Sequence, residues 1–202
     1  MRRIALVSML CLGVRLSGGD VPMTPEERTK VLKYLEESRK EFLGSIDGVT
    51  AEQWKWKPAP ERWSVGETAE HIVLAEALLF ANVKTAIGSA PNPAWEEKTK
   101  GKTELIERVM APRLGKASAP EPIVPSGKMT QAEVRETFLK QRVEIEKFAK
   151  ETQADLRQHT VEHPFAVFNT LNAYQWLIYA PLHTERHDKQ IAEVKATPGY
   201  PK

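Results

Sequence analysis

The sequence predicts an all-α protein, a four-helix bundle with a long connection between its second and third helices. Four segments begin with a helix-capping sequence and continue with apolar residues at helical spacing. No stretch alternates polar and apolar residues for long enough to indicate a strand. The chain has 202 residues, 41% hydrophobic and 28% charged, which suits one globular domain with a buried core.

The first two helices are marked by capping sequences. Residues 24–27, TPEE, place a threonine hydroxyl and a glutamate carboxylate where each accepts the other residue's backbone N–H, with proline at the first helical position. The apolar pattern behind them ends at Asp47 and Gly48. Residues 64–67, SVGE, repeat the arrangement, and the second apolar pattern ends at Gly88.

The third and fourth helices are predicted in the same way. Residues 130–133, TQAE, open the third helix, and residues 172–175, NAYQ, open a fourth that continues to Val194. Pro181 lies inside the fourth helix. Since proline lacks an N–H and clashes with the preceding turn, we expect a kink or a loosened turn just before His183.

A long connection, residues 91–128, joins the second helix to the third. It contains a predicted short helix near residues 103–110 and then a proline-rich stretch. A connection of this length allows the two helices to run parallel, whereas a short loop would make them antiparallel. The sequence shows no internal repeat and no boundary between domains.

The first nineteen residues have the layout of a secretory signal peptide. A basic start, MRR, is followed by an apolar run at residues 4–14 and by small residues at 17–19. The run is too short to span a bilayer. We therefore expect a signal peptide at residues 1–19, a bundle domain at 20–202, export to the periplasm or beyond, and no stable membrane association once the leader is removed. A misassigned start and a cytoplasmic protein are the alternative.

Charge and cysteine content restrict the classes of function. The formal net charge is +2, but residues 1–19 hold three arginines and no acid, which leaves 26 basic residues against 27 acidic ones. No basic run is interleaved with aromatic residues, so we expect no nucleic-acid partner. The one cysteine, Cys11, lies in the predicted leader. The processed chain would have no disulfide, cysteine ligand or cysteine nucleophile.

A pair of histidines on the fourth predicted helix suggests a metal site. His183 and His187 are four residues apart, so their rings project from one face, about 40° and about 6 Å from each other. Two such nitrogens can bind one metal ion. The same spacing also arises on solvated helix faces, and the charged residues around the pair fit that alternative.

His71, near the start of the second helix, is the candidate third ligand. Three histidines and an open position form a common catalytic zinc site. The alternative for His71 is a buried core histidine bonded to a neighbouring group. The helix is not that of a zinc peptidase, because such helices need glutamate directly after the first histidine and Thr184 stands there.

Other residues near these helices are expected to have structural roles, with a role at the metal site as the alternative. Trp54, Trp56 and Trp63 precede the second helix and should pack the end of the bundle, although Trp63 could also line the metal site. Glu67 should complete its capping box, with a hydrogen bond to a histidine ligand as the alternative.

His159 and His163 are also four residues apart, but they precede the fourth helix. His163 is followed by Pro164, which disfavours helical geometry at the histidine. We expect both to be structural or loop residues rather than ligands.

These features together resemble the DinB-like (DinB/YfiT) family of metalloenzymes. The resemblance covers roughly residues 24–196, and the order and spacing of its motifs are specific. The matching segments are residues 60–67 (PERWSVGE) with His71, residues 119–127 (APEPIVPSG) with Phe138 and Arg142, and residues 180–191 (APLHTERHDKQI).

The resemblance implies a bundle with two parallel central helices and a divalent metal, often nickel or zinc, bound by three histidines. By position these are His71, His183 and His187, and histidine is present at all three. A leader at residues 1–19 is a departure from most members. The family's frequent dimers imply a possible homodimer.

Three functions remain open at this point. Some relatives are thiol transferases, in which a metal stabilises the thiolate of a low-molecular-weight thiol; here the thiol would have to be a co-substrate. Hydrolysis by a metal-activated water is the second, although no general base stands out. The third is a non-enzymatic metal-binding or stress-response module. A small-molecule substrate is expected for the first two.

Overall fold

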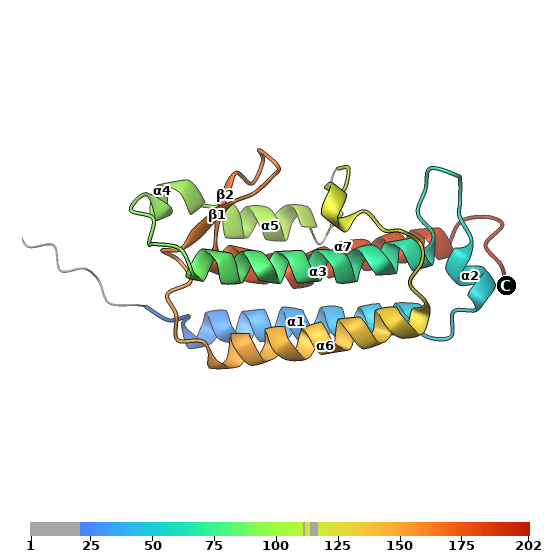
Figure 1. The fold of residues 1–202 in the computed structure, drawn as a ribbon, viewed down its shortest axis with the longest axis horizontal. Helices are drawn as coiled ribbons and strands as arrows, with labels where there is room; N and C mark the ends of the chain where they lie inside the picture. Colours follow the sequence, from blue (N-terminus) through green and yellow to red (C-terminus); the bar gives the residue numbers. More distant parts are fainter. Residues whose placement is uncertain (1–20, 111, 114–116) are drawn as a thin grey trace, which may run out of the picture.

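Four long helices form a bundle in the computed structural model, which describes residues 21–110, 112–113 and 117–202 (Figure 1). The predicted leader, residues 1–19, lies outside the described residues. Within those ranges, no helix combines the length and apolar character needed to cross a membrane. The four helices are α1 (Pro25–Ile46), α3 (Val65–Ile87), α6 (Gln131–Glu151) and α7 (Ala173–Lys195).

Each of the four helices begins at a reciprocal capping box, as the sequence predicts. The side chain of the capping residue accepts the N–H of the third helical residue, whose own side chain accepts the cap's N–H. Both bonds satisfy backbone donors that have no partner within the helix. The pairs are Thr24 with Glu27, Ser64 with Glu67, Thr130 with Glu133, and Asn172 with Gln175.

The long connection carries the chain back along the bundle, so α3 and α6 run parallel (Figure 1). Helices α1 and α7 run in the opposite direction, and α7 packs against both α3 and α1. The connection contains α4 (Trp95–Thr99), α5 (Lys102–Met110) and the short 3₁₀ helix η1 (Glu121–Ile123). Helix α5 is the short helix expected near residues 103–110, and it packs against α7.

The all-α prediction is confirmed, and the structure adds one short hairpin that the sequence does not indicate. Strands β1 (Thr160–Glu162) and β2 (Thr170–Asn172) form an antiparallel hairpin just before α7. Each strand has only three residues, and β2 is buried at all three, so no alternating pattern exists to be read. The short helix α2 (Ala51–Lys55) was also not predicted. Pro181 does not end α7, which continues as helix on both sides of it.

Helix α7 is the central helix of the bundle. All residues from 173 to 184 are buried, because α1, α3, α5 and the hairpin surround this half of the helix. Two apolar clusters fill the interior, one around Trp176 and Leu177 and the other around Phe42 and Phe138, whose ring centroids are 4.6 Å apart. A helix that is apolar all round is expected in such a position. His183 therefore lies at the end of the most enclosed part of the molecule.

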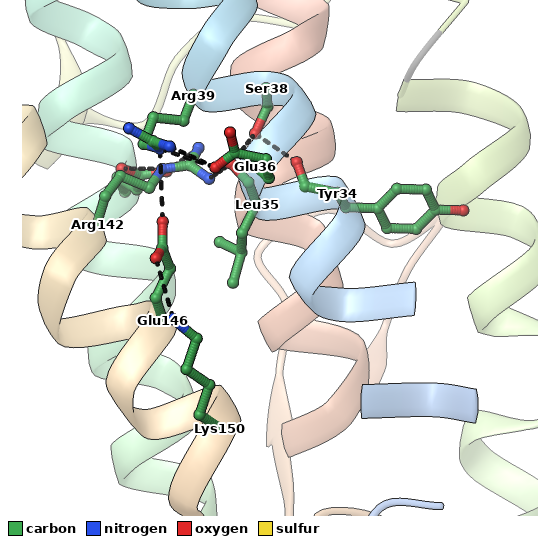
Figure 2. A network of polar contacts seen from close by, with 9 residues as sticks. Tyr34, Leu35, Glu36, Ser38, Arg39, Arg142, Glu146 and Lys150 are labelled. Carbon is green, nitrogen blue, oxygen red and sulfur yellow. Dashed lines mark hydrogen bonds and ion pairs between the residues drawn. The ribbon is translucent and has the colours of Figure 1, made fainter. Parts of the chain in front are cut away.

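Polar contacts join α1 to α6 (Figure 2). The guanidinium of Arg142 donates to the carbonyl oxygen of Leu35 at 3.0 Å. Further out, Glu146 lies 3.6 Å from both Arg39 and Lys150. The outer pairs are partly exposed and stabilise little, whereas Arg142 is 1% exposed and acts inside the bundle.

Substitution of Gly66 and of Gly44 by alanine should change the stability of the fold in opposite directions. A Cβ atom on Gly66 would lie 2.5 Å from Nε1 of Trp54, whose ring is held by its hydrogen bond to the carbonyl of Met129 at 3.1 Å. We expect Gly66→Ala to lower the free energy of unfolding by about 1–3 kcal/mol through overpacking. Gly44→Ala meets nothing within 4 Å and should raise it by about 0.5 kcal/mol. Denaturant unfolding of both variants checks this, and equal effects would contradict the packing described.

Candidate metal centre

His71 lies in the second turn of α3 and is 2% exposed. Its Nδ1 atom is 2.7 Å from the carbonyl oxygen of Ile123. Because a carbonyl only accepts hydrogen bonds, Nδ1 carries the ring proton and Nε2 keeps its lone pair. The backbone at Ile123 thus selects the tautomer in which Nε2 can bind a metal.

His183 and His187 project from one face of α7, as their spacing predicts. The Nδ1 atom of His187 donates to Oε1 of Gln190 at 3.0 Å, so its Nε2 atom also keeps a lone pair. Arg113 donates to the same amide oxygen at 2.8 Å and to Glu193 at 2.8 Å. Gln190 therefore orients the ring of His187, and Arg113 holds Gln190 in place.

The three histidines converge between α3 and α7. One ring nitrogen from each lies within 4.8 Å of the other two, and Nε2 of His71 is 3.2 Å from Nε2 of His187. A tetrahedral metal with bonds of about 2.0–2.1 Å holds its nitrogens about 3.3–3.4 Å apart. Two facing lone pairs at this distance repel each other unless a cation lies between them. The His71, His183 and His187 set could therefore hold a metal ion.

Burial keeps the three rings in the form that binds metals. It lowers the pKa of His71, although the hydrogen bond to Ile123 opposes the shift. Burial also lowers the pKa values of His183 and His187 well below the usual range, and the neighbouring imidazoles lower them further. A metal binds the neutral imidazole, so at neutral pH the three rings need not lose a proton to bind.

Glu70 holds the backbone that orients His71. Its carboxylate accepts hydrogen bonds from the N–H and hydroxyl of Ser126, at 2.8 and 2.7 Å, and from the N–H of Gly127 at 2.8 Å. Burial opposes the charge, but bonds from Ser126, Met129 and Gly127 outweigh it and lower the pKa of Glu70. Gly127 has a φ of 73°, a conformation that favours glycine. Glu70 and His71, which are adjacent on α3, thus both bond to residues 123–127 of the long connection.

A cavity of about 1040 Å³ opens beside the three histidines. Trp63 lines it, with its ring centroid 4.8 Å from that of His71 and 6.4 Å from that of His187, so this tryptophan lies beside the candidate metal centre. Arg186 and the paired Arg113 and Glu193 line the same space. Pockets for small molecules are usually about 300–1,000 Å³, and this one has room for a sizeable ligand or two small ones.

The other two histidines do not join the three. His159 lies just before β1, and its Nδ1 donates to the carbonyl of Ser89 at 2.8 Å. His163 follows β1 in the hairpin loop and is 9% exposed among aromatic rings. It lines the cavity at a different place from the three converging nitrogens.

Sequence reasoning missed two residues that orient the histidines. It singled out Glu67, whose carboxylate caps α3 and lies 2.9 Å from Nζ of Lys57. The carboxylate that acts on the site is Glu70, directly before His71. Its partners are 56 and 57 residues away, so no local pattern reveals them. Gln190 was detectable, since it lies three residues after His187 on the same helix.

The stability of the fold should depend on His163 at mildly acid pH. Burial lowers the pKa of His163 from 6.5 to about 4. Since the unfolded chain binds this proton more readily, stability falls as the pH drops from about 6.5 towards about 4. We expect His163→Phe to lose less stability than the wild type over this interval in denaturant unfolding. Equal losses would show that this ring is not buried in neutral form.

Comparisons with known proteins agree with this fold. Residues 34–191 match the family model of the DinB superfamily. The uncharacterized protein YuaE of Bacillus subtilis (strain 168) is 24% identical over 167 residues, which cover 81% of this chain and 96% of YuaE. The solved structure of YfiT from Bacillus subtilis has a TM-score of 0.52 at 16% identity and covers 89% of this chain and 91% of that one.

The structural match supports the architecture, because YfiT is described as a probable metal-dependent hydrolase with an unusual four-helix bundle topology. The family model covers most of the chain, from α1 to the last turns of α7. It includes all three converging histidines. The chain belongs to the DinB superfamily.

Proposed function

We propose that His71, His183 and His187 bind one divalent transition metal, nickel or zinc, and that the chain is a metalloenzyme. The observation that carries the proposal is the approach of two lone-pair nitrogens, Nε2 of His71 and of His187, to 3.2 Å. The third histidine completes a set of three neutral ligands. When bound, such a metal supplies Lewis acidity and lowers the pKa of a thiol or water beside it.

The residues around the histidines would prepare the site for this chemistry. Ile123 and Gln190 hold two of the rings in the required tautomer. Trp63 lies beside the rings of His71 and His187 and would limit the access of bulk water on that side. Arg186 lines the cavity and would attract an anionic substrate.

The reaction we propose is transfer of a low-molecular-weight thiol to an electrophile. The thiol sulfur forms a bond to an electrophilic carbon, the leaving group departs with its electron pair, and the thiol proton goes to solvent. Residues 21–202 contain no cysteine, so the thiol is a co-substrate. The cavity has room for both reactants, and this chemistry requires no carboxylate base.

Hydrolysis is the second candidate, supported by the description of YfiT. A hydrolase needs a group that takes a proton from water. Among the described residues that line the cavity, the carboxylates are Glu61, which is exposed to solvent, and Glu193, which already pairs with Arg113 at 2.8 Å. The thiol transfer therefore fits the surroundings of the histidines better.

Turnover assays with bacillithiol, mycothiol and glutathione test the transferase. Each thiol is supplied with a chromogenic electrophile to the metal-loaded protein. We expect turnover with one of the thiols, its loss in His183→Ala, and its retention in His159→Ala, a histidine outside the site. No turnover with any of the thiols by metal-loaded wild type would contradict thiol transfer. Ester or amide cleavage under the same conditions would support the hydrolase. If neither activity is detected, the result would favour a metal-binding module.

A further inference from the structure

One wall of the cavity is aromatic and extends from the hairpin loop to His183. The ring of His163 stacks on Trp176 with centroids 5.0 Å apart and planes at 20°. It also contacts Phe168 at 4.8 Å and Tyr179 at 5.3 Å. The ring of Tyr179 in turn lies parallel to that of His183 at 6.0 Å and 23°. A continuous π surface therefore connects the loop to the proposed metal ligand.

The proton on His163 has a fixed place. The backbone N–H of Phe165 donates to Nδ1 of His163 at 3.0 Å, so the neutral ring carries its hydrogen on Nε2. The loop is closed by the N–H of His163, which donates to the carbonyl of Asn169 at 2.5 Å. Asn169 has a φ of 50°, a conformation that asparagine tolerates. The hairpin thus presents a fixed imidazole N–H donor.

Two donors in this wall have no acceptor among the described residues. They are Nε2–H of His163 and the hydroxyl of Tyr179, and both residues line the cavity. Neither atom is among the fully buried unpaired atoms of the described chain, so both are at least partly accessible, on residues that line the cavity. A donor in such a confined place gains most from an acceptor that a ligand brings.

The charge beside these donors is positive. The half-buried guanidinium of Arg186 donates to the carbonyl of Val109 at 3.3 Å, lines the same cavity and acts electrostatically on the hydroxyl of Tyr179. The nearby acid Glu193 is paired with Arg113. An anionic oxygen fits this environment better than a neutral or cationic group.

We propose that this wall binds an aromatic carboxylate, whose oxygens accept from His163 Nε2 and Tyr179 Oη. The ring of the ligand lies against Phe165 and Phe168. This subsite rests on the proposed function in one respect: the ligand it holds is the electrophilic substrate, placed beside the metal. The binding itself depends on the wall and not on the metal.

Calorimetric titration with benzoate tests the subsite, with cyclohexanecarboxylate as a saturated acid of the same charge. Both acids are added to chelator-treated and to zinc-loaded protein. We expect benzoate to bind the metal-free protein and cyclohexanecarboxylate to bind several-fold more weakly. His163→Phe and Tyr179→Phe each keep a ring and remove one donor, and each should weaken benzoate binding about tenfold, as for a hydrogen bond to a charged group. His163→Gln, which keeps a donor, should bind more tightly than His163→Phe.

His159→Phe is the matched control, since this histidine belongs to the same hairpin region but does not line the cavity; its benzoate affinity should equal that of the wild type. Circular dichroism checks that each variant is folded. If His163→Phe does not fold, Tyr179→Phe alone decides the test. The proposal is overturned if benzoate binds only the zinc-loaded protein, if both acids bind equally, or if neither donor variant weakens binding. The metal content of the protein is measured separately, so that a failure of the proposed metal site can be distinguished from a failure of the benzoate subsite.

Discussion

Arg142→Met is expected to lower the free energy of unfolding by about 3–5 kcal/mol, because it leaves a carboxylate buried without its partner. Arg142 is 1% exposed and lies 2.5 Å from the carboxylate of Glu76, also 1% exposed. Its guanidinium donates further to the carbonyl of Leu35, on α1 (Figure 2), and to the hydroxyl of Thr184 at 3.1 Å. One side chain of α6 thus joins α1, α3 and α7.

Burial dominates the electrostatics of this pair. It raises the pKa of Glu76 and lowers that of Arg142, although each group partly offsets the effect on the other. Removing both charges should therefore cost less than removing one. We expect the double variant Glu76→Leu, Arg142→Met to recover much of the stability that Arg142→Met loses.

Denaturant unfolding of these variants measures the effect. Arg135→Met is the matched control, because Arg135 is an exposed arginine on the same helix; its substitution should change stability by less than about 0.5 kcal/mol. If Arg142→Met is as stable as Arg135→Met, the buried network does not exist as described. Thr184 is adjacent to His183, so metal affinity should also fall in Arg142→Met.

Glu70→Gln is expected to weaken metal binding by about 10–100-fold, the usual effect of losing a group that orients a ligand. The two carboxylate oxygens of Glu70 accept from both Ser126 and Gly127. A glutamine has one accepting oxygen and one NH₂ group, so at least one of these N–H groups loses its acceptor. The segment that carries Ile123 is then held less firmly, and with it the tautomer of His71.

Glu67→Gln is the control for Glu70→Gln, since glutamine is also accepted in a capping box and Glu67 bonds to Ser64 and Lys57 rather than to the 126–127 backbone. Metal titration of chelator-treated protein compares the two. We expect Glu67→Gln to bind metal as the wild type does. Equal affinity in all three proteins would show that the segment does not orient His71.

The four long helices could be predicted because their start signals are local. Each capping box joins residues three positions apart, and the apolar pattern behind it extends over five or more turns. The sequence at residues 50–53, TAEQ, has the same box, but α2 is too short for an apolar repeat to support it. The hairpin depends on pairing between Thr160 and Asn172 and on burial against α7, and neither is visible in three-residue strands.

The site could be predicted only in part. Spacing places His183 and His187 on one face, but it does not say that α3 packs beside them. The resemblance to the DinB-like family supplied His71, and the structure brings all three rings together. Glu70 contacts the long connection, and Arg113 is part of it. The path of this connection depends on the tertiary fold. The cavity and its aromatic wall depend on that path as well.

Elemental analysis of protein purified without a histidine tag tests the central claim most directly. The wild type and His159→Ala should carry about one nickel or zinc ion per chain, since a three-histidine site binds one ion. His71→Ala and His187→Ala should retain little or none after dialysis, because each loses a ligand nitrogen. A wild type without stoichiometric metal, or variants that retain it, would contradict the three-histidine metal centre.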